Sequence, residues 1–141
     1  MPYLQLDTPF THSVDAKRHL AKRLGEIYSV EMASNVNRLT VAIRELGEGG
    51  CWRCGDGEPY PAGILMCDIR IGRSAEKREA LAWKLVAACQ EILGFTKDNL
   101  NLEFTQHAGD EMFHTRYGGL SDEWREGEPD AFDTLAPSPD R

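Results

Sequence analysis

SVDAKRHLAKRL, residues 13–24, and SAEKREALAWKL, residues 74–85, decide the fold of this chain. The two segments align without a gap at a shift of 61 residues, and apolar positions outside them match at the same shift. Self-similarity of this kind indicates an internal duplication. We take residues 2–49 and 63–110 as the two copies.

The first copy has the pattern of a strand, a helix and a second strand. Residues 3–7 predict a short strand, and Ser13 is suited to cap a helix that has Asp15 in its first turn. Residues 38–46 alternate between apolar and polar side chains, as expected for a strand. The helix presents one apolar face at helical spacing, formed by Leu20, Leu24, Ile27 and Tyr28.

The second copy repeats this order. Residues 64–69 form a nearly continuous apolar run, which is typical of a central strand. Ser74 is suited to cap a helix that ends at Gly94, and alternation over residues 100–105 predicts the last strand. The apolar face of this helix contains Leu81, Leu85, Cys89 and Ile92.

Two tandem βαβ units predict an α/β (α+β) domain. Right-handed crossovers would place both helices on one face of a four-stranded sheet. The opposite face is semi-polar and would meet either water or another subunit. It carries Thr40, Arg44, Asn101, Glu103 and Thr105.

Composition indicates an ordinary soluble domain, residues 1–120, followed by an acidic tail. Of the net charge of −7, −5 lies in residues 121–141, where seven acidic residues accompany two arginines. The acidic balance argues against nucleic acid or an anionic membrane as a partner. The sequence shows no apolar run of membrane-spanning length and no secretory leader. We therefore expect a cytoplasmic protein with a poorly ordered C-terminal arm.

Arg70 and Arg73 break a local preference. They lie between a predicted strand and the second helix, where the positive end of the helix dipole disfavours cations. A bound anion such as a substrate carboxylate would resolve the conflict, through the guanidinium groups and the backbone amides near Gly72. The alternative is that the arginines point into solvent or pair with Asp68 or Glu76.

The duplication, a proline at position 2 and the segment DIRIGRS at residues 68–74 together resemble the tautomerase superfamily, which includes 4-oxalocrotonate tautomerase. The resemblance extends over residues 2–120. It looks most like the branch that contains malonate semialdehyde decarboxylase and cis-3-chloroacrylic acid dehalogenase. It implies that the two opening strands lie side by side, that the proline is close to the two arginines, and that the chain assembles as a trimer.

Pro2 is the residue that would carry out the chemistry. Removal of Met1 would turn the pyrrolidine nitrogen into a free secondary amine, whose pKa both burial and neighbouring arginines would lower. An amine near neutrality can take a proton from carbon and return it elsewhere. Because proline is also welcome as the first residue of a strand, a purely structural role is the alternative. The equivalent residue of the second copy, Gly63, is internal, which is consistent with one active site per chain.

These residues predict a keto–enol tautomerase. Pro2 would be its base and acid, and Arg70 and Arg73 would bind the carboxylate of a small 2-keto or 2-hydroxy-dienoic acid. The reaction requires no metal and no organic cofactor. Decarboxylation, hydration or dehalogenation of three-carbon acids on the same scaffold is an alternative, and so is a non-catalytic binding module.

The chain departs from the dehalogenases at their water-activating groups. The resemblance places a histidine, a tyrosine and a glutamate where this sequence has Tyr28, Glu103, and His114 or Arg116. Hydrolytic chemistry is therefore disfavoured. Tyr28 and His114, with Glu103 and His107, are candidates for a general acid. The alternative is a core tyrosine with a locally satisfied hydroxyl and surface histidines.

Cys51 and Cys54 lie in a glycine-rich loop, residues 47–63. Their spacing fits a redox pair or half of a zinc site, but the second pair of zinc ligands is missing. The loop could instead be a flap in which Trp52 and Arg53 cover a substrate. The alternative is that the two thiols lie in the loop without a function.

Overall fold

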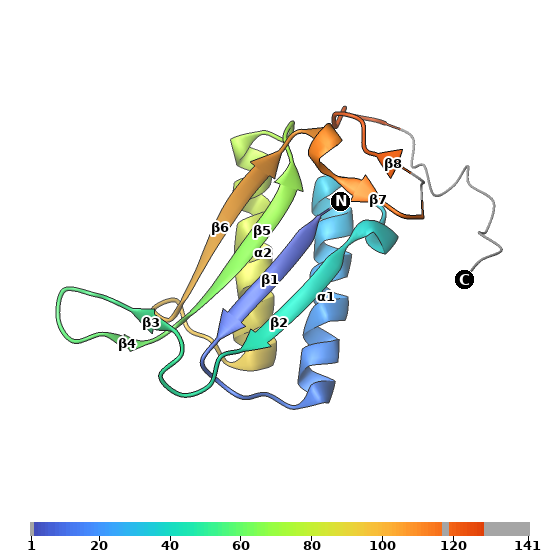
Figure 1. Ribbon diagram of the computed structural model, residues 1–141. Helices are drawn as coiled ribbons and strands as arrows, with labels where there is room; N and C mark the ends of the chain where they lie inside the picture. Colours follow the sequence, from blue (N-terminus) through green and yellow to red (C-terminus); the bar gives the residue numbers. More distant parts are fainter. Residues whose placement is uncertain (1, 117–118, 129–141) are drawn as a thin grey trace.

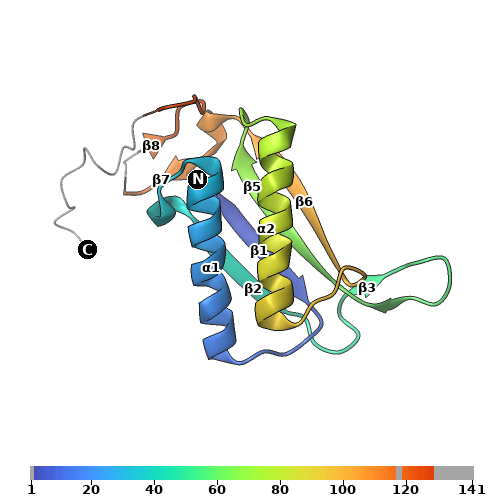
Figure 2. The same ribbon diagram turned by 180° about the vertical axis from the view of Figure 1, so that it is seen from behind.

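Each copy of the repeat forms one βαβ unit in the computed structural model, which describes residues 2–116 and 119–128. The first unit contains β1 (Tyr3–Thr8), α1 (Val14–Met32) and β2 (Thr40–Glu45). The second unit contains β5 (Gly63–Arg70), α2 (Ala75–Leu93) and β6 (Leu100–His107). Figure 1 shows the four strands as one sheet, and Figure 2 shows both helices side by side on the same face of it.

The sheet has the order β2-β1-β5-β6. Within each unit the two strands are parallel, and the units meet through an antiparallel pairing of β1 with β5. The predicted arrangement, with two helices covering one face of a four-stranded sheet, is confirmed. The opening strands of the two copies are neighbours.

The register of the sheet reproduces the sequence repeat. Tyr3 pairs with Thr40 in the first unit, and the residues 61 positions later, Ile64 and Asn101, pair in the second. Across the antiparallel junction Gln5 pairs with Met66, its own equivalent in the other copy. The two units are therefore related by a pseudo-twofold axis that passes between these two residues.

The core lies between the sheet and the helices. Alternate residues of β1 and β5 are buried and face the helices, because strand side chains alternate between the two faces of a sheet. Both helices begin as predicted: the Ser13 hydroxyl accepts from the amide of Ala16 at 3.1 Å, and the Ser74 hydroxyl accepts from Lys77 at 3.2 Å. α2 ends at Gly94, whose φ of 79° is the left-handed conformation that glycine adopts freely.

Two connections are more ordered than the sequence indicates. Residues 36–38 form a 3-10 turn that includes Arg38, the first residue of the predicted strand, and β2 begins only at Thr40. The glycine-rich loop forms a hairpin from β3 (Trp52–Arg53) and β4 (Tyr60–Pro61), which projects from one end of the sheet (Figure 1).

The segment after β6 also has structure. It makes a 3-10 turn at Gly109–Glu111 and a small hairpin from β7 (Phe113–His114) and β8 (Gly119–Leu120). Residues 121–128 then pack against the domain, so the expectation of a loose arm fails for this part of the tail. Residues 129–141 lie outside the described residues. Among the helices that the structure describes, none has both the length and the apolar character that crossing a bilayer would need.

Candidate active site

Six residues line a small pocket where the start of β1 meets the end of β5 (Figure 1 shows these strand ends together). They are Pro2, Tyr28, Ser34, Arg38, Arg70 and Arg73. The volume of the pocket is about 10 Å³, which is space for about one water molecule. Antiparallel pairing explains the meeting, because Tyr3 at the start of β1 lies opposite Asp68 near the end of β5. Pro2 itself is buried.

Arg73 is a buried cation whose Nε is available to bind a ligand. Only 5% of its surface is exposed. One terminal nitrogen donates to the carbonyl of Met32 at 3.0 Å, and the guanidinium lies 4.5 Å from the centroid of the Trp124 ring. Its buried Nε has no hydrogen-bond partner among the described residues. Burial lowers the pKa of Arg73, and an unmet buried donor of this kind favours an acceptor such as a carboxylate oxygen.

Arg70 is bound by the C-terminal segment. It is 7% exposed, and its Nη1 donates to the carbonyl of Asp122 at 2.6 Å. Its Nη2 forms an ion pair with the carboxylate of Glu128. The sequence left open that the two arginines point into solvent or pair with Asp68 or Glu76. Neither arginine does so: both are buried, and Arg70 pairs with Glu128.

Tyr28 is buried beside the two arginines. Desolvation raises the pKa of its hydroxyl to about 12, although the positive charges of Arg73 and Arg70 act in the opposite direction. The phenol therefore keeps its proton at neutral pH. In the pocket it is a neutral hydrogen-bond donor and not a base.

The fold of this chain is similar to that of several solved structures, although its sequence is not close to theirs. The sequence matches no family model and no curated protein. A member of the cis-3-chloroacrylic acid dehalogenase family superposes with a TM-score of 0.76 at 17% identity, over 86% of this chain and 84% of that one. A fused 4-OT, solved as a symmetric trimer, gives 0.74 at 19% identity, over 84% and 94%. Pt0534, inactivated by 2-oxo-3-pentynoate, gives 0.73 at 21%, over 84% and 95%.

The chain has the tautomerase-superfamily fold. On this fold the structure gathers four of the five predicted site residues, namely Pro2, Tyr28, Arg70 and Arg73, around one pocket. His114 is not among the residues that line it. It lies in β7, where its Nδ1 accepts from the amide of Arg116 at 3.1 Å, so the turn between β7 and β8 sets its position.

The other candidates of the sequence lie elsewhere on the tautomerase fold. Glu103 is exposed on the sheet face opposite the helices. His107 ends β6, and its ring lies 3.6 Å from the carboxylate of Glu111. Cys51 and Cys54 are free thiols in the β3–β4 hairpin, at the end of the sheet away from Pro2 (Figure 1). The hairpin therefore does not cover the pocket of its own chain.

Sequence reasoning missed several residues at the pocket. Ser34 and Arg38 line it from the connection between α1 and β2, and Trp124 and Glu128 contact the arginines from the tail. The alternating pattern assigned Arg38 to a strand. The 3-10 turn instead ends with it, after the side chain of Asn35 accepts from the amide of Asn37 at 2.8 Å. Asn at the cap of this turn was the only local signal.

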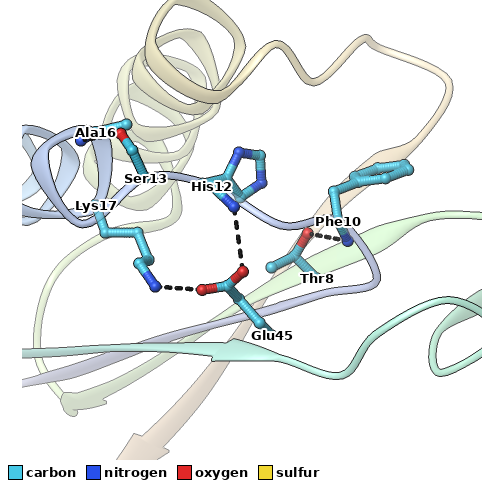
Figure 3. Close-up of polar contacts among 7 residues, drawn as sticks. All are labelled: Thr8, Phe10, His12, Ser13, Ala16, Lys17 and Glu45. Carbon is cyan, nitrogen blue, oxygen red and sulfur yellow. Dashed lines mark hydrogen bonds and ion pairs between the residues drawn. The ribbon is translucent and has the colours of Figure 1, made fainter.

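The pseudo-twofold axis predicts a second pocket at the equivalent place in the other unit, but a side chain fills that space. The residues equivalent to Pro2, Ser34 and Arg73 are Gly63, Phe95 and His12. Phe95 is buried, and a Cβ on Gly63 would come within 2.8 Å of its ring. A phenyl group thus occupies the space that is open in the other half. Figure 3 shows the neighbouring cluster, in which Glu45 accepts from the backbone amide of His12 at 3.1 Å and pairs with Lys17.

Proposed function

We propose that this chain is a tautomerase that moves a proton on a small 2-keto or 2-hydroxy-dienoic acid. Pro2, with its amine freed by removal of Met1, would be the base and acid. The observation that carries the proposal is the pocket itself, in which a buried Pro2 shares its lining with Arg70 and Arg73. Two buried cations disfavour protonation of a neighbouring amine.

In the proposed reaction Pro2 moves the proton, first as base and then as acid, while Arg73 and Tyr28 bind the substrate. Arg73 binds the carboxylate, since its Nε lacks a hydrogen-bond partner in the described part of the chain and its guanidinium is already held by the Met32 carbonyl. The Pro2 nitrogen takes a proton from the carbon beside the keto group, and the C–H electron pair enters the enolate. Tyr28, which keeps its proton, donates a hydrogen bond to the enolate oxygen. The ammonium of Pro2 then returns the proton to that oxygen or to a conjugated carbon.

Ketonisation of phenylenolpyruvate tests the proposal. Pro2→Ala leaves a primary amine of different basicity and geometry, and Arg73→Ala removes the carboxylate donor. We expect each to lower kcat/KM by at least about 100-fold. Arg53→Ala, in the distant hairpin, is the matched arginine control and should leave the rate unchanged. Wild-type rates in either pocket variant would contradict the proposal.

The inactivator of Pt0534 offers a second test. We expect 2-oxo-3-pentynoate, a 2-keto acid with an electrophilic alkyne, to modify this chain at the Pro2 nitrogen. Peptide mass spectrometry should find a mass gain of one reagent molecule on the N-terminal peptide. Labelling of Cys51 or Cys54 alone would instead show that the pocket does not activate its amine.

The N-terminus separates an enzyme from a binding module on the same scaffold. Retained Met1 would make the Pro2 nitrogen an amide, which is not basic. Intact-mass measurement of the purified chain should show loss of Met1. A chain that keeps Met1 in cells and still performs its role would favour the binding module.

We also propose that the chain forms a trimer through the sheet face opposite the helices. A fused 4-OT with this fold is a symmetric trimer. The face has half-buried apolar residues at its centre, Ile64 and Met66, with charged groups such as Arg44 and Glu103 around them. That combination suits a subunit interface with an apolar centre and a polar rim.

A further inference from the structure

Residues 122–128 form a strap across the two pocket arginines. The strap is held on Arg70 by the Asp122 carbonyl at 2.6 Å and by the Glu128 carboxylate. In its middle the Trp124 ring lies over the guanidinium of Arg73 at 4.5 Å and near the ammonium of Lys77 at 5.5 Å. An acidic and aromatic segment therefore lies on a cationic surface.

The domain surface is shaped to seat this strap. Gly72 has a φ of 138°, and a Cβ there would lie 2.9 Å from the Trp124 ring. At Gly109 a Cβ would lie 2.3 Å from the carbonyl oxygen of Asp122, and the Gly109 amide donates to the side chain of Glu123 at 2.8 Å. The strap thus makes close backbone contacts at two glycines, as a bound peptide does when side chains are absent beneath it.

The strap occupies the same groups that a substrate carboxylate needs. Glu128 presents a carboxylate to Arg70, which is the chemistry expected of the substrate. The pocket that the two arginines help to line has a volume of only about 10 Å³, too little for a 2-keto acid. Asp122 and Glu128 contact Arg70, and Trp124 contacts Arg73. A carboxylate ligand that binds both arginines therefore reaches its full set of donors only after Glu128 leaves Arg70.

We propose that Glu128 is an internal competitor for the carboxylate site, and that the strap is an autoinhibitory element which carboxylate ligands displace. This inference rests on the proposed carboxylate site at Arg70 and Arg73. The ligand class is a small organic carboxylate, because the group it replaces is one. A tethered carboxylate competes at a high effective concentration, so its removal strengthens binding of a free one.

Trp124 reports on the strap directly. Trp52 and Trp83 lie in the hairpin and on α2, and are 51% and 70% exposed, so Trp52→Phe and Trp83→Phe leave a chain in which Trp124 is the tryptophan that emits. Titration with 2-oxobutyrate, at constant ionic strength set with chloride, should shift the Trp124 emission to longer wavelength. In the same background Glu128→Gln should lower the half-saturating concentration by about tenfold.

Glu126→Gln is the matched control. Glu126 lies in the same strap, its side chain is 85% exposed, and it forms an ion pair with Lys77 at 3.7 Å. Its removal should leave the half-saturating concentration within about twofold of the parent. If Glu128→Gln failed to fold by circular dichroism, Glu128→Ala would replace it in the same titration.

Two results would overturn the inference. One is equal 2-oxobutyrate binding in Glu128→Gln and the parent, and the other is calorimetric binding with no change in Trp124 emission. Failure of the proposed function has a different signature. Carboxylates would still displace the strap, while Pro2→Ala would ketonise phenylenolpyruvate as fast as the wild type.

Discussion

Arg73 lies between the ends of two helices. The residue after it, Ser74, caps the start of α2, where the helix dipole opposes a positive charge. The Arg73 guanidinium, however, donates to the carbonyl of Met32, the last residue of α1. At that end of a helix the dipole favours a positive charge. Tertiary packing thus offsets a local conflict and leaves one donor of Arg73 for a ligand.

At Tyr28 the hydroxyl can be removed with little change in packing. The side chain is 2% exposed, so Tyr28→Phe keeps the buried ring. If the protonated phenol donates to an enolate, kcat for phenylenolpyruvate should fall by about tenfold or more, with a smaller change in KM. Steady-state kinetics test this, and urea unfolding should confirm that the fold is kept. An unchanged kcat would show that Tyr28 is only a core residue.

Gly63→Ala tests whether Phe95 fills the second pocket. A Cβ there would lie 2.8 Å from both the Asp7 carbonyl oxygen and the Phe95 ring. We expect Gly63→Ala to lower the free energy of unfolding by about 1–3 kcal/mol through overpacking. Gly57→Ala is the control, because a Cβ at Gly57 would have no atom of the described residues within 4 Å apart from its chain neighbours. Equal midpoints of urea unfolding for the two variants would contradict the packing argument.

At the scale of elements, the connection from β1 to α1 depends on the cluster of Figure 3. Glu45 at the end of β2 accepts from the His12 amide at 3.1 Å and pairs with Lys17 on α1. Thr8 accepts from the amide of Phe10 at 3.1 Å. Side chains of a strand and a helix therefore fix the loop that closes the first crossover.

His12 should make this connection sensitive to acid. Burial lowers its pKa below the ordinary 6.5, with Lys17 acting in the same direction and Glu45 against it. The unfolded chain then binds a proton more readily than the folded one. The contribution of neutral His12 to stability is therefore complete above about pH 6.5 and is lost as the pH falls below that value.

Chemical unfolding at about pH 7.5 and about pH 5 measures this effect. His12→Gln should lose less stability between the two pH values than the wild type does. His19→Gln, at an exposed site on α1, should behave like the wild type. A His12→Gln variant with the full acid sensitivity would place its origin elsewhere.

At the scale of the whole molecule, the duplication has produced a symmetric framework with an asymmetric site. The sheet keeps the repeat in its register, as the pairing of Gln5 with Met66 shows. The two ends of the sheet differ, because one holds Pro2 beside Arg73 and the other holds Gly63 beside Phe95. Phe95 therefore fills one of the two equivalent sites, and a pocket remains at the other.

Met66 tests the proposed trimer. It lies at the pseudo-twofold axis on the sheet face opposite the helices. Met66→Lys would bury a charge in the trimer interface, so we expect it to dissociate the trimer to monomers. Light scattering gives the mass of each species. Val30→Lys, at a site 78% exposed on α1, is the control and should remain trimeric, while a monomeric wild type would contradict the assembly itself.

Most of the residues that line the pocket can be predicted from the sequence. The sequence marks Pro2 by its place at the chain start, and Arg70 and Arg73 by their place before a helix cap. Tyr28 is a candidate only through the resemblance to the tautomerase superfamily, because an apolar helix face by itself indicates a core residue. Arg38 was placed in a strand, because alternation alone does not distinguish a strand from the turn before it.

The strap contacts were not predictable in the same way. Arg70 is separated from Asp122 by 52 residues and from Glu128 by 58. No periodicity connects residues at such distances. The composition of the tail predicts only a poorly ordered arm, and it does not indicate which cation one of the tail carboxylates contacts.

The two βαβ units, their caps and the helix-covered face follow from the amino-acid pattern alone, because hydrophobic periodicity and capping act within a few residues. Two other features appear only when the chain is folded: Phe95 fills one of the two equivalent pockets, and Glu128 and Trp124 contact the arginines of the other. Those outcomes depend on which distant side chains fit a given space and charge, and that is settled only when the elements pack together.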